Sequence, residues 1–219
     1  MQAPHLVPIT RVDTDLPAVA AVRLMPEALR QRFLTPPVWQ PEVIAERKFM
    51  DRAPMCAAVL IPIVMRAEPT VLLTQRSAHL STHAGQIAFP GGKLDESDVD
   101  AASAAQREAY EEVGLESHWV EVLGQLPLYT TGSAFMVTPV VALVQPDFTL
   151  QPNRHEVSDV FEVPLAFLMN PANHRHHRVD WQGVQRHWLS MLYQDGVQER
   201  FIWGATAGML RNFYRFLVA

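Results

Sequence analysis

The feature that most constrains this chain is a turn with two consecutive glycines, followed by a helix that ends in glutamates. The turn is Phe89-Pro90-Gly91-Gly92-Lys93, and the acidic stretch is Arg107-Glu108-Ala109-Tyr110-Glu111-Glu112-Val113-Gly114. The pattern predicts a helix over residues 99–113, with Ser97 or Asp98 as its N-cap and a glycine just beyond its end. Alanine and valine at helical spacing predict one narrow apolar face.

Three glutamates in that helix, Glu108, Glu111 and Glu112, are spaced at i, i+3 and i+4, so their carboxylates share one side of it. Like charges at this spacing destabilise a helix by roughly 0.2–0.5 kcal/mol per pair. The last turn is also the negative end of the helix dipole. A divalent cation among the three would reverse both penalties. The alternative is a solvated acidic face, and the double-glycine turn upstream favours the metal.

The glycine turn supplies what such a metal site needs, because glycines let the backbone approach a ligand closely. A backbone carbonyl exposed there, together with the glutamates, would make an all-oxygen site of the kind that Mg²⁺ prefers. A site of this kind suits hydrolysis of a phosphoanhydride, since the metal offsets phosphate charge and activates a water. Arg107, four residues before Glu111, would orient a glutamate through charge-assisted hydrogen bonds.

Composition narrows the class of protein. Of the 219 residues, 48% are hydrophobic and 19% are charged, an ordinary globular balance. The net charge of −5 argues against a general nucleic-acid partner. No apolar run reaches the ~18 residues that span a bilayer, and no signal peptide is evident. The single cysteine, Cys56, lies in an apolar run and is expected to be buried and inert. We therefore expect a soluble cytoplasmic protein with a small-molecule substrate.

The order of elements predicts an α+β fold, an αβα sandwich around a mixed sheet. Residues 1–50 are rich in proline and are expected to form an N-terminal arm packed on a main domain of residues 51–219. Strands are expected at 56–64 and 70–74 (a hairpin), 86–89, 120–126, 135–144, 156–161, 179–181, 185–192 and 200–203, and further helices at 164–169 and 206–217.

Residues 92–115 resemble the Nudix box, a motif in which a glycine, a glutamate and an Arg-Glu-x-x-Glu-Glu run recur at fixed spacing. The half from Arg107 to Leu115 matches throughout. The first half is one residue longer than the usual pattern, and the position of its glutamate falls near Asp98. The resemblance implies the Nudix fold and a requirement for Mg²⁺ or Mn²⁺.

The same resemblance implies roles for individual residues. Glu108 and Glu112 would be the metal ligands, with Glu111 and the Gly91 carbonyl beside them. The general base would be Glu156 or one of the box glutamates. A homodimer is the oligomeric state that the resemblance favours.

A second resemblance concerns the segment before the box. Leu72-Leu73-Thr74-Gln75-Arg76-Ser77, then Gly85 and Phe89-Pro90-Gly91-Gly92, is similar to the signature of Nudix coenzyme A pyrophosphatases. Its second arginine is replaced here by Ser81. The similarity continues to Asn153, Glu156 and residues 202–207. It implies cleavage of coenzyme A to 3′,5′-ADP and 4′-phosphopantetheine, with Arg76, Lys93 and Gly85 on the coenzyme.

Two other functions stay open. Ser81 leaves room for another nucleoside diphosphate derivative, such as ADP-ribose, NADH or a dinucleoside polyphosphate. A non-catalytic binding protein with this fold would be expected to lose box carboxylates, and all three remain.

Two segments of the sequence contain more than one histidine. His174-Arg175-His176-His177-Arg178 is expected to be a solvated basic loop rather than a zinc site. Consecutive residues of a strand face opposite ways, so only His174 and His176 would share a face, and no cysteine or carboxylate lies at ligand spacing. A weaker hypothesis is that it attracts the 3′-phosphate of the coenzyme. His79 and His83 are expected to be solvated, and Trp181, Trp188 and Trp203 to lie in the core or a dimer interface.

Overall fold

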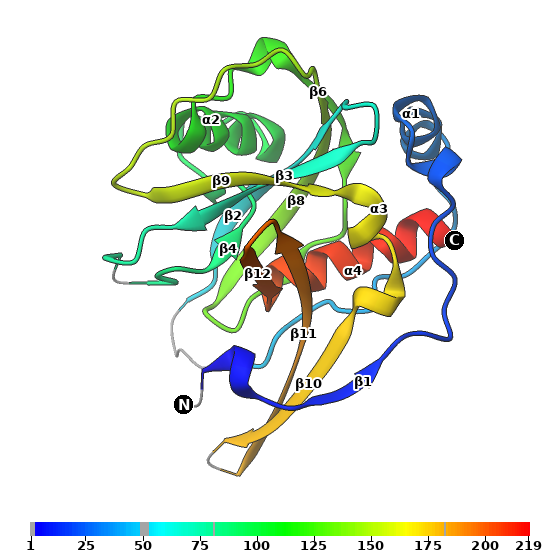
Figure 1. Ribbon diagram of the computed structural model, residues 1–219. Coiled ribbons are helices and arrows are strands. Elements are labelled where there is room, and N and C mark those ends of the chain that lie inside the picture. Colours follow the sequence, from blue (N-terminus) through cyan, green and yellow to red (C-terminus); the bar gives the residue numbers. More distant parts are fainter. Residues whose placement is uncertain (1–2, 49–52, 81, 182) are drawn as a thin grey trace.

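The computed structural model describes residues 3–48, 53–80, 82–181 and 183–219 (Figure 1). Its helices are α1 (Pro26–Leu34), α2 (Ala101–Val113), α3 (Leu165–Leu168) and α4 (Ala205–Val218), with short 3₁₀ turns at Pro4–Leu6, Ala21–Leu24, Ser117–Trp119 and Pro171–Asn173. Its strands are β1 (Ile9–Val12), β2 (Met55–Val64), β3 (Thr70–Arg76), β4 (Ile87–Ala88), β5 (Gly91–Lys93), β6 (Val120–Gln125), β7 (Tyr129–Thr130), β8 (Phe135–Val144), β9 (Val157–Pro164), β10 (Arg175–Trp181), β11 (Val184–Asp195) and β12 (Gln198–Trp203).

The larger sheet is mixed, as the order of elements predicts. Strands run in the order β4-β3-β2-β8-β6, while β5, β7 and β9 pair with β2, β8 and β3. The central pair, β2 and β8, is parallel over ten residues of each strand, and every other pair in this sheet is antiparallel. The predicted hairpin is confirmed, since Ile63 and Val64 pair with Val71 and Thr70.

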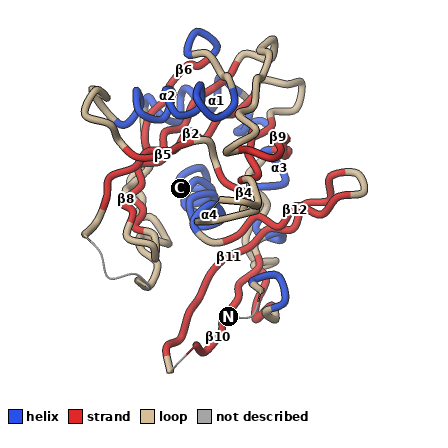
Figure 2. The backbone as a smooth tube through the Cα atoms, turned by 90° about the vertical axis from the view of Figure 1, so that its left-hand side faces the viewer, coloured by secondary structure: helices blue, strands red, loops and turns tan. Residues whose placement is uncertain are grey.

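The core has two parts, one on each face of this sheet. On one face, the small side chains of α2 (Ala104, Ala105 and Ala109) pack against apolar residues of β2 and β8. On the other face, α4 packs with α1 and the alternate residues of the same strands. Figure 2 shows α4 between this sheet and the smaller antiparallel sheet β1-β10-β11-β12. The α+β sandwich is therefore confirmed, and in the described ranges no helix is both long and apolar enough to cross a membrane.

The N-terminal segment contacts the rest of the chain through a strand and a buried ion cluster. β1 pairs antiparallel with β10, a strand pairing that the sequence pattern does not predict. Arg211 of α4 is buried and forms ion pairs with Asp13 at 3.0 Å and Glu42 at 2.8 Å. Breaking a buried ion pair leaves an uncompensated charge, so this cluster holds the segment firmly against α4.

The expectation for residues 174–178 is wrong, because they lead into and form β10 rather than a solvated loop. His174 and His177 are buried. The His174 Nε2–H donates to the Leu168 carbonyl at 2.8 Å, and its Nδ1 accepts a hydrogen bond from Arg211 at 3.0 Å. These two bonds fix a neutral imidazole in the core, which a tract of histidines and arginines does not suggest.

Cys56 is exposed, which contradicts the expectation of a buried thiol. It is the second residue of β2, whereas the well-buried part of that strand begins at Ala57. Apolar neighbours in the sequence therefore do not guarantee burial at a strand end. His79 and His83 are exposed, as predicted, and Trp188 and Trp203 are half-buried on the smaller sheet. The side chain of Trp181 lies outside the described part of the structure.

We expect a pH-dependent stability from His174. Burial, first, and then the charge of Arg211 lower its pKa from 6.5 to about 4, although the hydrogen bond to Leu168 opposes the change. Between these two pH values the unfolded chain binds a proton that the folded chain does not. The contribution of neutral His174 to the free energy of unfolding is therefore complete above pH 6.5 and is lost as the pH falls through 4. Between these values the free energy of unfolding changes with a slope approaching ~1.4 kcal/mol per pH unit.

Urea unfolding at several pH values measures this slope. In His174→Gln, glutamine can still donate to Leu168 and accept from Arg211, but it takes up no proton. The variant is expected to have a shallower dependence between pH 6.5 and 4. An unchanged dependence would show that other groups cause it.

Candidate active site

The helix that carries the glutamates begins later than its sequence suggests. The N-cap of α2 is Asp100, not Ser97 or Asp98. The Asp100 carboxylate accepts a hydrogen bond from the Ser103 amide at 2.7 Å, and the Ser103 hydroxyl accepts one from the Asp100 amide at 3.0 Å, which completes a capping box. The C-terminal end agrees with the prediction, since Gly114 follows the helix with φ of 73°.

Both glycines of the turn are required by close contacts. Gly91 and Gly92 lie in β5, where they pair with Val59 and Ala58 of β2. A Cβ on Gly91 would overlap the backbone of these two β2 residues. A Cβ on Gly92 would overlap the carboxylate of Glu108. The turn therefore brings a backbone strand directly against a glutamate of α2, and a larger residue at either position would separate them.

Glu112 is the most buried carboxylate of the helix, with 3% of the residue exposed. Its Oε2 accepts a hydrogen bond from the Gly91 amide at 3.3 Å, and its Oε1 lies 3.5 Å from Nη1 of Arg76. Burial raises the pKa of Glu112 to about 7, and the charges of Glu108 and Glu156 add to this rise, while Arg76 and the Gly91 amide oppose it. Glu112 is therefore a buried carboxylate whose charged form is disfavoured mainly by its removal from water.

Arg107 organises the polar groups around the other glutamates. Its guanidinium donates to both oxygens of Asp98, at 3.0 and 2.9 Å, and to the Lys93 carbonyl at 3.1 Å. Its Nη1 also donates to Glu108 and Glu111, each at 3.1 Å. The predicted bond to Glu111 is present. Asp98, near which the glutamate position of the box falls, thus binds Arg107 despite the extra residue in the spacing.

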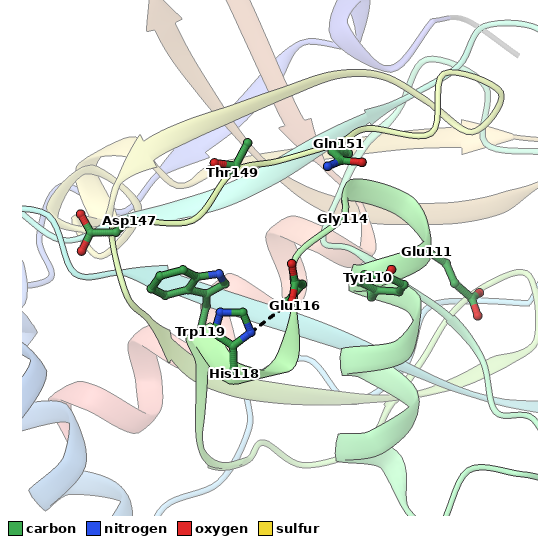
Figure 3. A pocket seen from close by; sticks show the side chains of 9 residues that line it. All are labelled: Tyr110, Glu111, Gly114, Glu116, His118, Trp119, Asp147, Thr149 and Gln151. Carbon is green, nitrogen blue, oxygen red and sulfur yellow. Dashed lines mark ion pairs between the residues drawn. The ribbon is translucent and has the colours of Figure 1, made fainter.

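Glu111 is the most exposed of the three glutamates. Its side chain is 53% exposed and its carboxylate is paired with Arg107. Figure 3 shows it at the edge of a depression at the end of α2, directed away from His118 and Trp119. The nine residues lining this depression include three carboxylates and no lysine or arginine, so it is unsuited to a chain of phosphates. Glu111 therefore lies beside Glu108, with which it shares Arg107, but its carboxylate is exposed whereas that of Glu112 is buried.

Glu156 and the predicted phosphate-binding residues lie on loops beside the buried glutamates. The loop that carries Glu156 is bonded to the last turn of α2, where the Asn153 amide donates to the Glu112 carbonyl at 2.9 Å. Burial raises the pKa of Glu108, and the charges of Glu111 and Glu156 add to this rise. Arg76 ends β3, and its carbonyl accepts a hydrogen bond from the Gly85 amide at 3.1 Å. Lys93 is exposed. Ser81 lies outside the described residues.

The arrangement fits a divalent ion for which the protein supplies only some of the ligands. In the parts of the chain that the structure describes, no three His, Cys, Asp or Glu side chains are grouped closely enough to hold an ion. Mg²⁺, however, is usually bound by one or two carboxylates and completes its shell with water and substrate phosphate. Glu108 and the buried Glu112 supply two carboxylates.

Comparison with known proteins identifies the class. Residues 54–186 match the family model of the NUDIX domain, which is more than half of the chain. The chain therefore belongs to the Nudix family, and it is a hydrolase of the class that acts on nucleoside diphosphate derivatives.

The chain is also similar to individual proteins. An uncharacterized Nudix hydrolase named NudL from Escherichia coli strain K12 is 47% identical over 159 residues, covering 71% of this chain and 79% of NudL. An Ap4A hydrolase structure from C. elegans is 23% identical and covers 54% of this chain and 85% of its own, with a TM-score of 0.44. The NUDIX domain of Shewanella oneidensis NrtR complexed with ADP ribose is 24% identical, covering 52% of this chain and 75% of its own, with a TM-score of 0.41.

Proposed function

We propose that the protein hydrolyses the pyrophosphate bond of coenzyme A or its derivatives, giving 3′,5′-ADP and 4′-phosphopantetheine. The observation that carries this proposal is the position of the signature residues. Arg76 of the signature lies 3.5 Å from Glu112, and the signature glycines Gly91 and Gly92 contact Glu112 and Glu108. The segment whose sequence resembles coenzyme A pyrophosphatases therefore borders the acidic pair of the box.

Glu108 and Glu112 would hold a Mg²⁺ or Mn²⁺ ion, with the Gly91 carbonyl beside them. When bound, such an ion offsets phosphate charge and lowers the pKa of an attacking water. Arg107 keeps Glu108 in place through its bond at 3.1 Å and is itself anchored by Asp98. Glu111, which shares Arg107 with Glu108, would stand beside this pair as an outer ligand or base.

Glu156 is the group that we assign as general base. Its loop is hydrogen-bonded to the turn that carries Glu112, so its carboxylate would stand beside a water held at Glu108 and Glu112 and accept its proton. Arg76 and Lys93 would bind the phosphates, and Gly85 would allow the coenzyme to approach the loop. The Nε of Arg76 is buried and has no hydrogen-bond partner among the described residues, so this guanidinium is incompletely paired.

A substrate panel tests the proposal. We expect coenzyme A, assayed with Mg²⁺ or Mn²⁺, to have a kcat/KM about tenfold or more above those of ADP-ribose, NADH and a dinucleoside polyphosphate, because the signature loop would contact parts of the coenzyme that the others lack. Release of 3′,5′-ADP is the readout. Ser81, which stands where the signature has an arginine, favours the alternative that another nucleoside diphosphate derivative is preferred. A higher kcat/KM for one of those compounds would establish it.

We further infer that residues 51–219 make up the Nudix domain and that residues 1–50 are an arm upon it. β12 and α4, which follow the matched residues, pack on β11 and supply part of the core. The homodimer stays a prediction, and gel filtration with light scattering would test it.

A further inference from the structure

The loop that carries Glu156 is joined to the last turn of α2. The Gln151 amide donates to the Val113 carbonyl at 2.8 Å, and the Asn153 amide donates to the Glu112 carbonyl at 2.9 Å. These bonds satisfy two carbonyls that a helix end otherwise leaves unpaired. Gly114 makes the contact possible, because a Cβ there would lie 2.8 Å from the Gln151 nitrogen. The loop and the helical turn bearing Glu112 therefore form one unit.

Asn153 makes more hydrogen bonds in this loop than its neighbours. Its carbonyl accepts from the amides of Glu156 at 2.9 Å and Val157 at 2.8 Å. Its side-chain Oδ1 accepts from the His155 amide at 3.2 Å, and its Nδ2 donates to Oε1 of Glu156 at 3.1 Å. A carboxylate and a backbone amide can be satisfied together only with the side-chain amide in this orientation.

The loop backbone is held from a second side by Ser77. The Ser77 amide donates to the Glu156 carbonyl at 2.8 Å, and the Ser77 hydroxyl donates to the Arg154 carbonyl at 3.2 Å. The backbone position of Glu156 therefore depends on several bonds. Among the described residues, one hydrogen bond fixes the direction of its carboxylate, the bond from the Asn153 side-chain amide.

Without the hydrogen bond from Asn153, this direction of the Glu156 carboxylate would be electrostatically unfavourable. The bond from the Asn153 amide to the Glu112 carbonyl brings the loop of Glu156 to the end of α2 that carries the other two carboxylates, and the charge of Glu156 adds to the rise in their pKa. A half-exposed glutamate side chain without such a hydrogen bond would turn toward solvent, where like charges are screened.

We propose that Asn153 is a positioning residue, whose side-chain amide holds the Glu156 carboxylate beside the Glu108–Glu112 pair. This inference rests on the proposed function, in which Glu156 is the general base. Asn153 itself does not contact the reacting atoms. Its backbone bond to Glu112 and its side-chain bond to Glu156 couple the base to the turn that carries the metal ligand.

The test is a double-mutant cycle between Asn153→Ala and Glu156→Gln, with coenzyme A and Mg²⁺ as reactants. Asn153→Ala keeps the three backbone bonds and removes only the amide group. We expect kcat to fall about 10–100-fold, as for groups that orient a catalytic side chain, with KM for coenzyme A and the Mg²⁺ concentration for half-maximal rate unchanged. In the Glu156→Gln background the same substitution is expected to change kcat less than about twofold.

Two further variants control for general effects on the loop and for loss of folding. Gln151→Ala changes an exposed side chain of the same segment and is expected to keep the wild-type kcat. If Asn153→Ala does not fold, the isosteric Asn153→Asp takes its place in the cycle, since it replaces the donor by a carboxylate that repels Glu156. Thermal unfolding of each variant reports the folded fraction.

Two results would overturn the inference. Equal losses from Asn153→Ala in both backgrounds would mean that Asn153 acts independently of Glu156. A wild-type kcat in Glu156→Gln would remove the base that Asn153 is said to position, while hydrolysis of coenzyme A would continue. Failure of the proposed substrate is a different result, because wild-type protein would then leave coenzyme A intact, and the cycle would be run on ADP-ribose or whichever compound of the panel is cleaved.

Discussion

Glu112→Gln is expected to lower kcat for hydrolysis of coenzyme A about a thousandfold with little change in stability. The loss follows because a bound divalent ion supplies several kcal/mol of transition-state stabilisation, and each ~1.4 kcal/mol is worth a factor of ten. Glutamine has the size of glutamate and still accepts the hydrogen bond from the Gly91 amide, so the packing at the end of α2 is kept. Steady-state kinetics at saturating Mg²⁺ or Mn²⁺ measure the effect.

The control for this substitution is Glu116→Gln. Glu116 is an exposed glutamate just beyond the same helix, and its ion pair is with His118 rather than with any residue of the acidic pair. It is expected to retain the wild-type rate. Hydrolysis by Glu112→Gln near the wild-type rate, in protein that unfolds at the wild-type temperature, would remove Glu112 from the metal site.

Gly92→Ala is expected to lower kcat about a hundredfold, although it adds a single methyl group. That methyl group would occupy the position of the Glu108 carboxylate, which must then move away from β5. A displacement of about 1 Å at a reacting centre is enough to cost a hundredfold in rate. The strain of an overpacked site would also lower the free energy of unfolding by about 1–3 kcal/mol.

A matched glycine separates the two effects of this substitution. Gly183 has φ of 72° in the β10–β11 turn, and no atom of the other residues that the structure describes lies within 4 Å of the position of a Cβ there. Gly183→Ala is expected to cost about 1–2 kcal/mol of stability through its left-handed backbone and to leave kcat unchanged. If Gly92→Ala keeps the wild-type kcat, the contact between β5 and Glu108 has no part in catalysis.

Local sequence signals predict much of this fold because they reflect contacts within a few residues. Gly114 ends α2 where the pattern says, and the run from Phe135 to Val144 forms one strand with the predicted bounds. The start of α2 is harder, because Ser97, Asp98 and Asp100 can each cap a helix. The choice of Asp100 depends on Ser103 completing the capping box and on Asp98 being bound by Arg107.

Features that depend on distant contacts are not predictable in this way. β1 is mostly exposed and has no alternating pattern, and its strand conformation comes from pairing with β10, more than 160 residues away in the chain. The burial of His174 likewise depends on Arg211 of α4. Cys56 is exposed because it precedes the covered part of its strand.

In the candidate site, too, the features set by local sequence are predictable and those set by distant contacts are not. Helical spacing places Glu108, Glu111 and Glu112 on one side of α2, and the structure bears out the bond between Arg107 and Glu111. Spacing alone does not say that Glu112 is buried and Glu111 exposed, since this depends on β5 and on the loop at 151–156. Asn153 carries no signal of its own beyond the resemblance, and its contact with Glu156 is visible only in three dimensions.

The most direct measurement is identification of the products of coenzyme A by mass spectrometry, with and without a divalent ion. Hydrolysis at the pyrophosphate predicts 3′,5′-ADP and 4′-phosphopantetheine in equal amounts when Mg²⁺ or Mn²⁺ is present, and intact coenzyme A when the ion is chelated. Intact coenzyme A under both conditions, or a product that retains the pyrophosphate, such as dephospho-coenzyme A, would contradict the proposal.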